Sequence, residues 1–543
     1  MRFHRYRPRL WGAAAFVVAA SLAATTLNPQ AGPPANAAEY DGVDCVVSLP
    51  GSSPTNSMLP DPFTKLDGTR ISAKSEWECR RAEIKELAED SIYGEKPGMP
   101  DSVTGSVSSS NITVNVSDQG RSASFSASVD LPSGSGPFPA VIVLGGLGAD
   151  TDTIKSSGAA VINFDPYEVG QEDTSRSNKQ GAFYDIYGSS SSTGLLMAWS
   201  WGVSRIIDVI EQSNGSVIST DGTGVTGCSR FGKGAFTAGA FDQRIDLTMP
   251  IESGTGGVPA LRGVAQEDGA QPLSNAYSEQ PWFGDVFNSY TSNPAALPVD
   301  MHEIVGMVAP RGLLIMENPH IDWLGATSGS VAALGGAEVY KALGAQENIT
   351  YWSDVQDGSH CATRSEWTAP LQQSIQKFLL GTGSAPGEFR IASGASGNLS
   401  AWRNWQTPTL SDDEPTDEPT DDPTDDPTDE PTDEPTDEPT DDPSGVCTAS
   451  YQTINSWSSG YQGEVTVSNN TASTLNGWSV DMTLASGQSI SNLWNGDNSG
   501  TSGAITVSNV AWNGSIAPDG STTFGFVASG SSTAPSGLTC TSP

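Results

Sequence analysis

Seven consecutive copies of the tetrapeptide Pro-Thr-Asp-(Asp/Glu) occupy positions 415–442 of the chain. The repeat contains no large apolar side chain, so it has nothing to bury and is not expected to fold. Proline at every fourth position and repulsion among the carboxylates should keep it extended at roughly 3 Å per residue. The 543 residues must therefore fold as separate units. We predict a large domain at 38–405, a linker at 406–446 and a small domain at 447–543.

The N-terminus has the pattern of an export signal. Four arginines within the first nine residues precede an apolar run at 10–24, and small residues follow as far as Ala37. This order is typical of a secretory signal peptide, which we assign to 1–37. Because the apolar run is shorter than the ~20 residues that a membrane span requires, we expect a secreted, extracellular protein without a membrane anchor.

The composition is strongly acidic. The chain carries 63 acidic and 26 basic side chains, which gives a formal net charge of −37. A surface of this sign repels nucleic acid and anionic membranes. We therefore expect neither as a partner.

The large domain alternates short apolar runs with stretches of helical periodicity between 139 and 380. Such alternation is typical of parallel strands joined by crossover helices, so the expected fold class is α/β, a layered sandwich. The small domain instead shows short alternating strands between Gly, Asn and Ser turns, which predicts an antiparallel β-sandwich. The strands expected in the large domain are 140–144, 159–164, 224–227, 245–251, 312–317 and 349–355.

The segment 224–233 predicts a strand that runs into a helix through a Gly-x-Ser turn. In a nucleophile elbow, such a turn exposes a serine hydroxyl above the strand ends, which favours Ser229 as a nucleophile. Phe231 occupies the position of the second glycine of that motif, and Gly232 follows one residue late. The motif alone is therefore equally compatible with an ordinary strand–helix turn.

A serine nucleophile needs a base, and three histidines follow the signal peptide. His360 lies in a Gly- and Ser-rich loop after the last expected strand, which fits the chain order Ser, acid, His of α/β-hydrolases. His302 precedes a helix that reads as packed, and His320 directly follows a proline. We therefore expect His360 to be the base and the other two to be structural.

The acid that orients the imidazole has two equally weighted positions. Glu252 ends the strand that follows the nucleophile strand, so its carboxylate can reach the same sheet edge as Ser229. Asp322 follows the next strand, as does Glu317, and both are well placed for the same role. The residues alone do not decide whether Glu252 or Asp322 is the acid.

Two cysteines adjoin the proposed catalytic residues. Cys228 precedes Ser229, and Cys361 follows His360. If the serine and histidine come within hydrogen-bonding reach, their neighbours approach the ~5.5 Å Cα separation of a disulfide. The alternative is a buried free thiol at Cys228, which the even count of six cysteines in an exported chain disfavours.

The segment around the serine resembles the signature of the glucuronoyl esterases, carbohydrate esterase family fifteen. The resemblance covers roughly 226–381 and implies an α/β-hydrolase fold with three layers. Six ordered matches carry it, namely GCSRFGK at 227–233, IESG at 251–254, QPWF at 280–283, APRG at 309–312, IDWLG at 321–325 and SHC at 359–361.

This resemblance implies hydrolysis of the ester between 4-O-methyl-glucuronic acid on xylan and an alcohol on lignin. It implies Glu252 as the acid, with Asp322 as a minor alternative, and it implies an oxyanion role for Arg230. A guanidinium at a helix start suits the negative charge that develops when an ester carbonyl is attacked. The sugar-binding residues that the resemblance implies are Lys233, Gln271, Glu279 and Trp323.

The small domain contains four tryptophans and, between 447 and 540, no lysine or arginine. Three of the tryptophans stand among Ser, Asn and Gly, where exposed flat rings suit the flat apolar faces of glucose units. The runs around them (NSW, NGW, NLW and AWNGSI) resemble carbohydrate-binding module family two. The resemblance implies a planar cellulose-binding face of Trp457, Trp494 and Trp512, with Trp478 in the core.

The resemblances also imply the remaining disulfides. Cys45–Cys79 is the second pair expected in the large domain. Cys447–Cys540 would join the two ends of the module.

Together these features predict a monomeric serine esterase that acts on a glucuronoxylan–lignin ester and is carried to plant cell wall by a cellulose-binding module. We expect no metal and no organic cofactor. The alternatives are an acetyl-xylan or feruloyl esterase on the same scaffold, and a cellulose-binding wall protein whose large domain has lost catalysis.

Overall fold

The computed structural model describes residues 39, 45–51, 55–412, 446–457, 460–471, 473–510, 513–518 and 520–542. The signal peptide expected at 1–37, the tetrapeptide repeat and Trp512 lie outside these residues. Contacts divide the chain into two compact units, with the boundary at 419–420. Each unit is described by itself.

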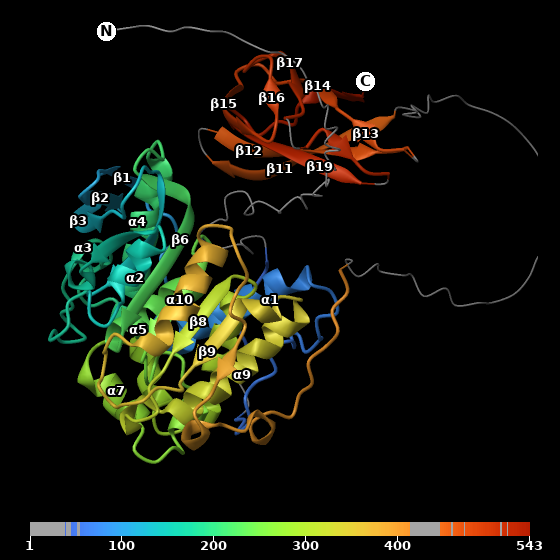
Figure 1. Ribbon diagram of the computed structural model, residues 1–543. Coiled ribbons are helices and arrows are strands. Elements are labelled where there is room, and N and C mark those ends of the chain that lie inside the picture. The colour runs from blue at the N-terminus through green and yellow to red at the C-terminus, as the bar shows by residue number, and fades with distance from the viewer. Residues whose placement is uncertain are drawn as a thin grey trace, which may run out of the picture. The chain divides into compact units, whose positions relative to one another are not determined.

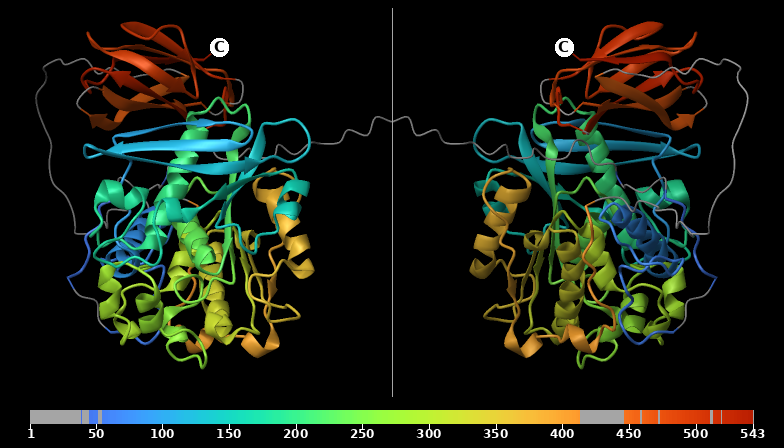
Figure 2. Two further views of the ribbon diagram at one scale, coloured as in Figure 1. Left: turned by 90° about the vertical axis from the view of Figure 1, so that its left-hand side faces the viewer. Right: turned by 90° about the vertical axis from the view of Figure 1, so that its right-hand side faces the viewer.

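A ten-stranded sheet forms the centre of the large unit, in the order β1-β2-β3-β5-β4-β6-β7-β8-β9-β10. The strands from β5 to β10 run parallel, whereas β1, β2 and β3 form an antiparallel extension that joins β5 (Figures 1 and 2). The strand bounds are β1 Ser102–Val107, β2 Asn111–Asp118, β3 Arg121–Asp130, β4 Phe138–Leu144, β5 Ala160–Phe164, β6 Ile218–Cys228, β7 Leu247–Ile251, β8 Gly312–Met316, β9 Ile349–Trp352 and β10 Phe389–Arg390.

Strand β4 shows why the sheet needs a layer of helices on each face. Ala140, Ile142 and Leu144 belong to one buried apolar cluster, whereas Val141 and Val143 belong to the other. Successive side chains of a strand point to opposite faces, so an apolar run of this kind must be covered on both sides. The sandwich expected from the alternating pattern is confirmed.

The first cluster includes side chains of α4, α5, α8 and α9, and the second includes side chains of α2 and α10. These two sets therefore form the outer layers. The helix bounds are α1 Glu76–Ala88, α2 Thr151–Ser156, α3 Ala182–Tyr187, α4 Leu195–Gln212, α5 Arg230–Phe241, α6 Leu261–Val264, α7 Leu273–Glu279, α8 Met301–Val308, α9 Ala326–Ala342 and α10 Ser365–Phe378. Among the described residues, no helix combines the length and apolar character needed to cross a membrane.

The small unit is an antiparallel sandwich around a core that includes Val465, Trp478 and Phe526. One sheet has the order β11-β12-β19-β15 and the other β16-β17-β14-β20, with a short β13-β18 pair beside them. The strand bounds are β11 Cys447–Trp457, β12 Gly460–Asn469, β13 Leu475–Asn476, β14 Ser479–Thr483, β15 Ser489–Trp494, β16 Asp497–Asn498, β17 Ala504–Ser508, β18 Ser515–Ile516, β19 Ser521–Ser529 and β20 Ser536–Thr541.

Candidate functional site

Ser229 lies between the end of β6 and the first residue of α5. Its backbone has φ of +60° and ψ of −126°, a conformation that is rare for residues other than glycine. The Ser229 N–H donates to the carbonyl oxygen of Ile251 at 2.9 Å, which ties the turn to the neighbouring strand β7. Such strained turns concentrate at functional sites.

The glycines on either side of Ser229 explain the irregular motif. A Cβ at position 227 would lie 2.6 Å from the backbone oxygen of Phe231, and a Cβ at position 232 would lie 2.6 Å from that of Ile251. Both positions therefore require glycine for close backbone approach. The Phe231 ring packs against Tyr167 and Trp199 at centroid distances of 5.7 Å.

His360 and Glu252 form a hydrogen-bonded pair. Nδ1 of His360 lies 2.6 Å from Oε2 of Glu252, which follows the last residue of β7. The same oxygen accepts the N–H of Cys361 at 2.7 Å, and Oε1 accepts from Asn318 Nδ2 at 3.2 Å. Glu252 is fully buried, with Arg364 Nη2 at 3.6 Å from Oε1. With Nδ1 engaged, Nε2 is the ring nitrogen available for proton exchange.

The other two acids considered for this role make other contacts. Asp322 is exposed, in the short 3-10 turn η5 (Asp322–Leu324), with its side chain against the backbone of Gly269. Glu317 is fully buried and accepts a hydrogen bond from Ser253 Oγ at 3.3 Å. Burial and the nearby charge of Glu252 raise the pKa of Glu317 to about 8.

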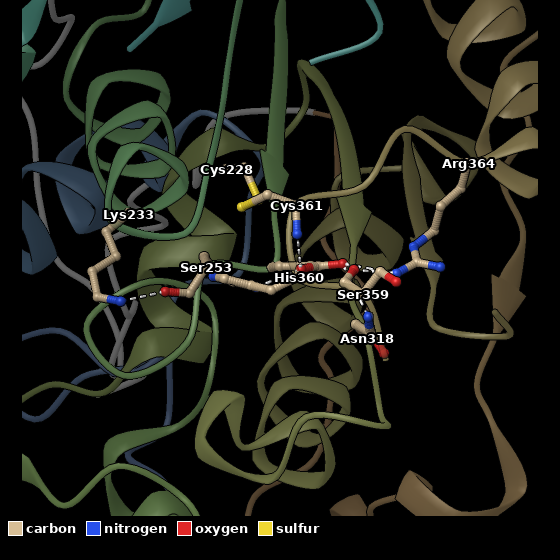
Figure 3. The surroundings of a disulfide bond; sticks show 9 residues. Cys228, Lys233, Ser253, Asn318, Ser359, His360, Cys361 and Arg364 are labelled. Atoms are coloured by element: carbon tan, nitrogen blue, oxygen red, sulfur yellow. Dashed lines mark hydrogen bonds and ion pairs between the residues drawn. A yellow bond between two sulfur atoms is a disulfide. The ribbon is translucent and has the colours of Figure 1, made fainter. Parts of the chain in front are cut away.

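The disulfide between Cys228 and Cys361 joins the serine turn to the histidine loop (Figure 3). Its Cα atoms are 5.8 Å apart, and both cysteines are buried. A Cβ at position 148 would lie 2.7 Å from Cys228 Cβ, so Gly148 leaves room for the bridge. Cys45–Cys79 and Cys447–Cys540 are also bonded.

Ser229 and His360 line one cleft of about 540 Å³. Trp323 stands at this cleft with 54% of its surface exposed, and its ring meets that of His360 edge-on at 6.0 Å. Gln271 Nε2 donates to Glu279 Oε2 at 2.5 Å, so these two side chains form one polar wall. The other side chains of the lining belong to Arg230, Lys233, Ala270, Pro272, Asn275, Trp282 and Leu324.

Lys233 occupies the buried side of the cleft. Its Nζ donates to the carbonyl oxygen of Ser253 at 2.5 Å (Figure 3). The same Nζ lies 5.2 Å from the centre of the Trp282 ring. Burial lowers the pKa of Lys233 to about 8, although the charges of Glu279 and Glu317 oppose that effect.

The remaining histidines are held by backbone carbonyls. Nε2 of His302 lies 2.9 Å from the carbonyl oxygen of Pro60, and Nε2 of His320 lies 2.8 Å from that of Val355. His302 is fully buried, and burial lowers its pKa to about 4. These contacts fit structural roles.

One group of side chains among the described residues has the spacing of a metal site, namely Cys228, Glu252, His360 and Cys361. The two sulfur atoms are joined in the disulfide, so neither is a thiolate ligand. Nδ1 of His360 and the Glu252 carboxylate bond each other. The donor set does not fit a metal.

In the small unit, Trp457 ends β11 and Trp494 ends β15, the two edge strands of one sheet. Their backbones pair with Gly460 and Gly525 respectively. Trp478 is buried, stacks on Phe524 at 5.6 Å and donates its indole N–H to Asn513 O at 2.8 Å. Trp478 thus lies in the core, as the resemblance to carbohydrate-binding module family two implies.

The large unit has a mainly parallel sheet between two helical layers, a strained serine after one strand and a Glu-His pair after later strands. This combination defines an α/β-hydrolase. Residues 114–344 match the family model described as glucuronyl esterase, fungi, and residues 447–542 match a cellulose binding domain. Residues 413–446 match a model described as PT disordered repeat.

Known proteins similar to this chain identify the family. A 4-O-methyl-glucuronoyl methylesterase of Hypocrea jecorina is 41% identical over 371 residues, which cover 67% of this chain and 79% of that protein. A methylesterase of the same name from Neurospora crassa is also 41% identical, over 67% of this chain and 93% of that protein. The chain therefore belongs to the glucuronoyl esterase family and carries a C-terminal cellulose-binding domain.

Solved structures agree with this assignment. The catalytic domain of a Hypocrea jecorina glucuronoyl esterase superposes with a TM-score of 0.63 at 39% identity, over 67% of this chain and all of that chain. A serine-to-alanine mutant of the Sporotrichum thermophile enzyme gives a TM-score of 0.63 at 40% identity, over 68% of this chain and all of that chain. That structure holds methyl 4-O-methyl-β-D-glucopyranuronate.

Proposed function

We propose that this protein is a secreted serine esterase that hydrolyses the ester between 4-O-methyl-glucuronic acid of glucuronoxylan and lignin alcohols. The observation that carries the proposal is a single cleft that holds Ser229 and His360 beside a charged and aromatic lining. The names of the similar proteins support the uronate ester as substrate.

The proposed reaction is an acyl transfer. His360, oriented by Glu252 through the 2.6 Å bond, accepts the hydroxyl proton of Ser229 as Oγ attacks the ester carbonyl. The proton then passes to the departing alcohol, and an acyl-enzyme remains. Water, deprotonated by the same histidine, attacks the acyl-enzyme and releases the uronate while the proton returns to Ser229.

Arg230 is the proposed stabiliser of the oxyanion. It is the first residue of α5, directly after the nucleophile, and its side chain is 38% exposed at the cleft. A guanidinium and the positive end of a helix both favour negative charge at this place.

The sugar is proposed to lie against the remaining cleft residues. The amide and carboxylate wall of Gln271 and Glu279, together with the amine of Lys233, offers partners for the hydroxyl groups. The exposed ring of Trp323 offers a flat apolar surface for the pyranose. None of these roles requires a metal or an organic cofactor.

The cellulose-binding domain is proposed to hold the enzyme on plant cell wall through Trp457, Trp494 and Trp512. We also propose that the chain is exported by the segment 1–37, that the catalytic domain spans 38–405, and that 406–446 is the linker to the module at 447–543. The acidic composition supports a monomer with no nucleic acid or membrane partner.

Hydrolysis assays test the catalytic proposal directly. The purified protein is expected to release alcohol from the benzyl ester of glucuronic acid much faster than acetate from acetyl-xylan or ferulate from feruloyl esters. A preference for acetyl-xylan or feruloyl substrates would overturn the proposed specificity, and absence of turnover on all three would overturn the enzyme assignment.

A further inference from the structure

Glu172 is a buried carboxylate directly behind the cleft. It stands after the 3-10 turn η2 (Pro166–Glu168), and its side chain is only 5% exposed. Oε1 accepts the indole N–H of Trp282 at 2.5 Å, and Oε2 accepts from Arg230 Nη1 at 2.5 Å and from the hydroxyl of Tyr167 at 2.8 Å. Glu172 therefore joins three segments that are far apart in the sequence.

Each of these donors is itself held in place. The Tyr167 ring packs against Phe231 and Trp199, at centroid distances of 5.7 and 6.1 Å. Trp282 is 2% exposed, and the Arg230 guanidinium carbon lies 5.7 Å from its ring centre. Because these partners are packed in place, the carboxylate holds Nη1 of Arg230, whose side chain remains 38% exposed at the cleft.

The charge of Glu172 also changes the electrostatics of the guanidinium. Burial alone would lower the pKa of Arg230, but the hydrogen bond and negative charge of Glu172 outweigh burial and raise it. Burial, and then the same carboxylate, raise the pKa of Tyr167 to about 12, so this hydroxyl stays protonated and donates. Glu172 is thus the ion-pair partner of Arg230.

We infer that Glu172 is a positioning residue that aims Arg230 at the oxyanion and offsets its charge. The inference rests on the proposed oxyanion role of Arg230. The substrate ester is neutral, whereas the tetrahedral intermediate and the uronate product are anionic. An Arg230 with no carboxylate partner would hold the product carboxylate more tightly and would be less well aimed at the oxyanion.

Glu172→Gln tests this role, because it keeps the shape of the side chain and removes its charge. We expect kcat on the benzyl ester of glucuronic acid to fall about tenfold, because displacing a catalytic group by a fraction of an ångström lowers the rate by about this factor. KM should change little. Free glucuronate should inhibit this variant at a lower concentration than it inhibits the wild type. Glu168→Gln is the matched control, because Glu168 lies in the preceding turn and accepts from the backbone of Ser126; its kcat should be unchanged.

A double-mutant cycle with Arg230→Ala separates positioning from a general structural effect. If Glu172 acts through Arg230, Glu172→Gln lowers kcat in the wild type and has almost no further effect in the Arg230→Ala background. An equal loss in both backgrounds, or a wild-type kcat in Glu172→Gln, would overturn the inference. If the melting temperature shows that Glu172→Gln does not fold, the cycle is run with Tyr167→Phe in its place. Tyr167→Phe removes one hydrogen-bond donor to Glu172 and no charge, and it should lower kcat about threefold in the wild type but not in the Arg230→Ala background.

The wild type is assayed first. Absence of turnover of the benzyl ester by the wild type would refute the proposed function itself. Turnover by the wild type with additive losses in the cycle would refute only the role of Glu172.

Discussion

Replacing Glu252 by glutamine tests which acid orients the histidine. In the wild type, Oε2 takes two donors, His360 Nδ1 at 2.6 Å and the Cys361 N–H at 2.7 Å, while Oε1 takes Asn318 Nδ2 and lies 3.6 Å from Arg364. Glutamine has one accepting oxygen. If the glutamine oxygen takes the place of Oε2, the NH₂ group faces the Asn318 and Arg364 donors. If the oxygen takes the place of Oε1, the NH₂ group faces the imidazole and the Cys361 N–H.

Either orientation leaves at least one buried donor without an acceptor, at a cost of roughly 1–3 kcal/mol in the free energy of unfolding. Either orientation also removes the charge that stabilises the imidazolium. The comparable change in other serine hydrolases lowers kcat about 10⁴-fold. We therefore expect Glu252→Gln to fold, to lower kcat by about 10³ to 10⁴, and to leave KM nearly unchanged.

The assay is steady-state hydrolysis of the benzyl ester of glucuronic acid, with melting temperature recorded for each variant. Asp322→Asn is the matched control, because Asp322 is exposed and its side chain lies against Gly269; its kcat should stay within about twofold of the wild type. The orienting role of Glu252 is refuted if Glu252→Gln retains more than about a tenth of wild-type kcat, or if Asp322→Asn loses as much kcat as Glu252→Gln does.

Three further perturbations have defined outcomes. Replacing both Cys228 and Cys361 by alanine opens a loop of 133 residues, which should lower the free energy of unfolding by up to about 5 kcal/mol in urea titrations; an unchanged midpoint would contradict this. The folded pKa of Glu317, about 8, lies above its ordinary value of 4.5, so its stabilising contribution is complete below pH 4.5 and is lost as pH rises to about 8. The stability of the wild type relative to Glu317→Gln should therefore fall across that window, and a constant difference would be contrary evidence. The double change Trp457→Ala with Trp494→Ala should abolish sedimentation with crystalline cellulose but not ester hydrolysis, and undiminished sedimentation would exclude the proposed binding face.

The sheet could be predicted because buried parallel strands have continuous apolar runs. All six strands expected between 140 and 355 are present as β4 to β9, with ends shifted by a few residues. The antiparallel extension β1 to β3 was not predicted. Its strands alternate small polar and apolar residues, as in Ser122-Ala123-Ser124-Phe125, and this weak pattern covers one face only.

The residues of the candidate site were predictable to different degrees. The glycine at 232, one residue later than in the standard motif, left the elbow ambiguous. In the structure Gly232 is the residue that approaches the backbone of β7, and the sequence alone does not show this. The residues alone could not choose between Glu252 and Asp322, because both follow strands that end at the same edge of the sheet.

Glu172 was missed because its role depends on tertiary contacts. It lies in a polar loop, 58 residues from Arg230 and 110 residues from Trp282. An isolated glutamate in such a loop ordinarily reads as a solvated surface charge. Only the folded chain brings three donors to its carboxylate.

Turnover of the benzyl ester of glucuronic acid by the wild type and by Ser229→Ala tests the central claim most directly. We predict clear hydrolysis by the wild type and a loss of kcat on the order of 10⁶-fold in the variant, with its melting temperature unchanged. Substantial turnover by folded Ser229→Ala would contradict the proposed mechanism.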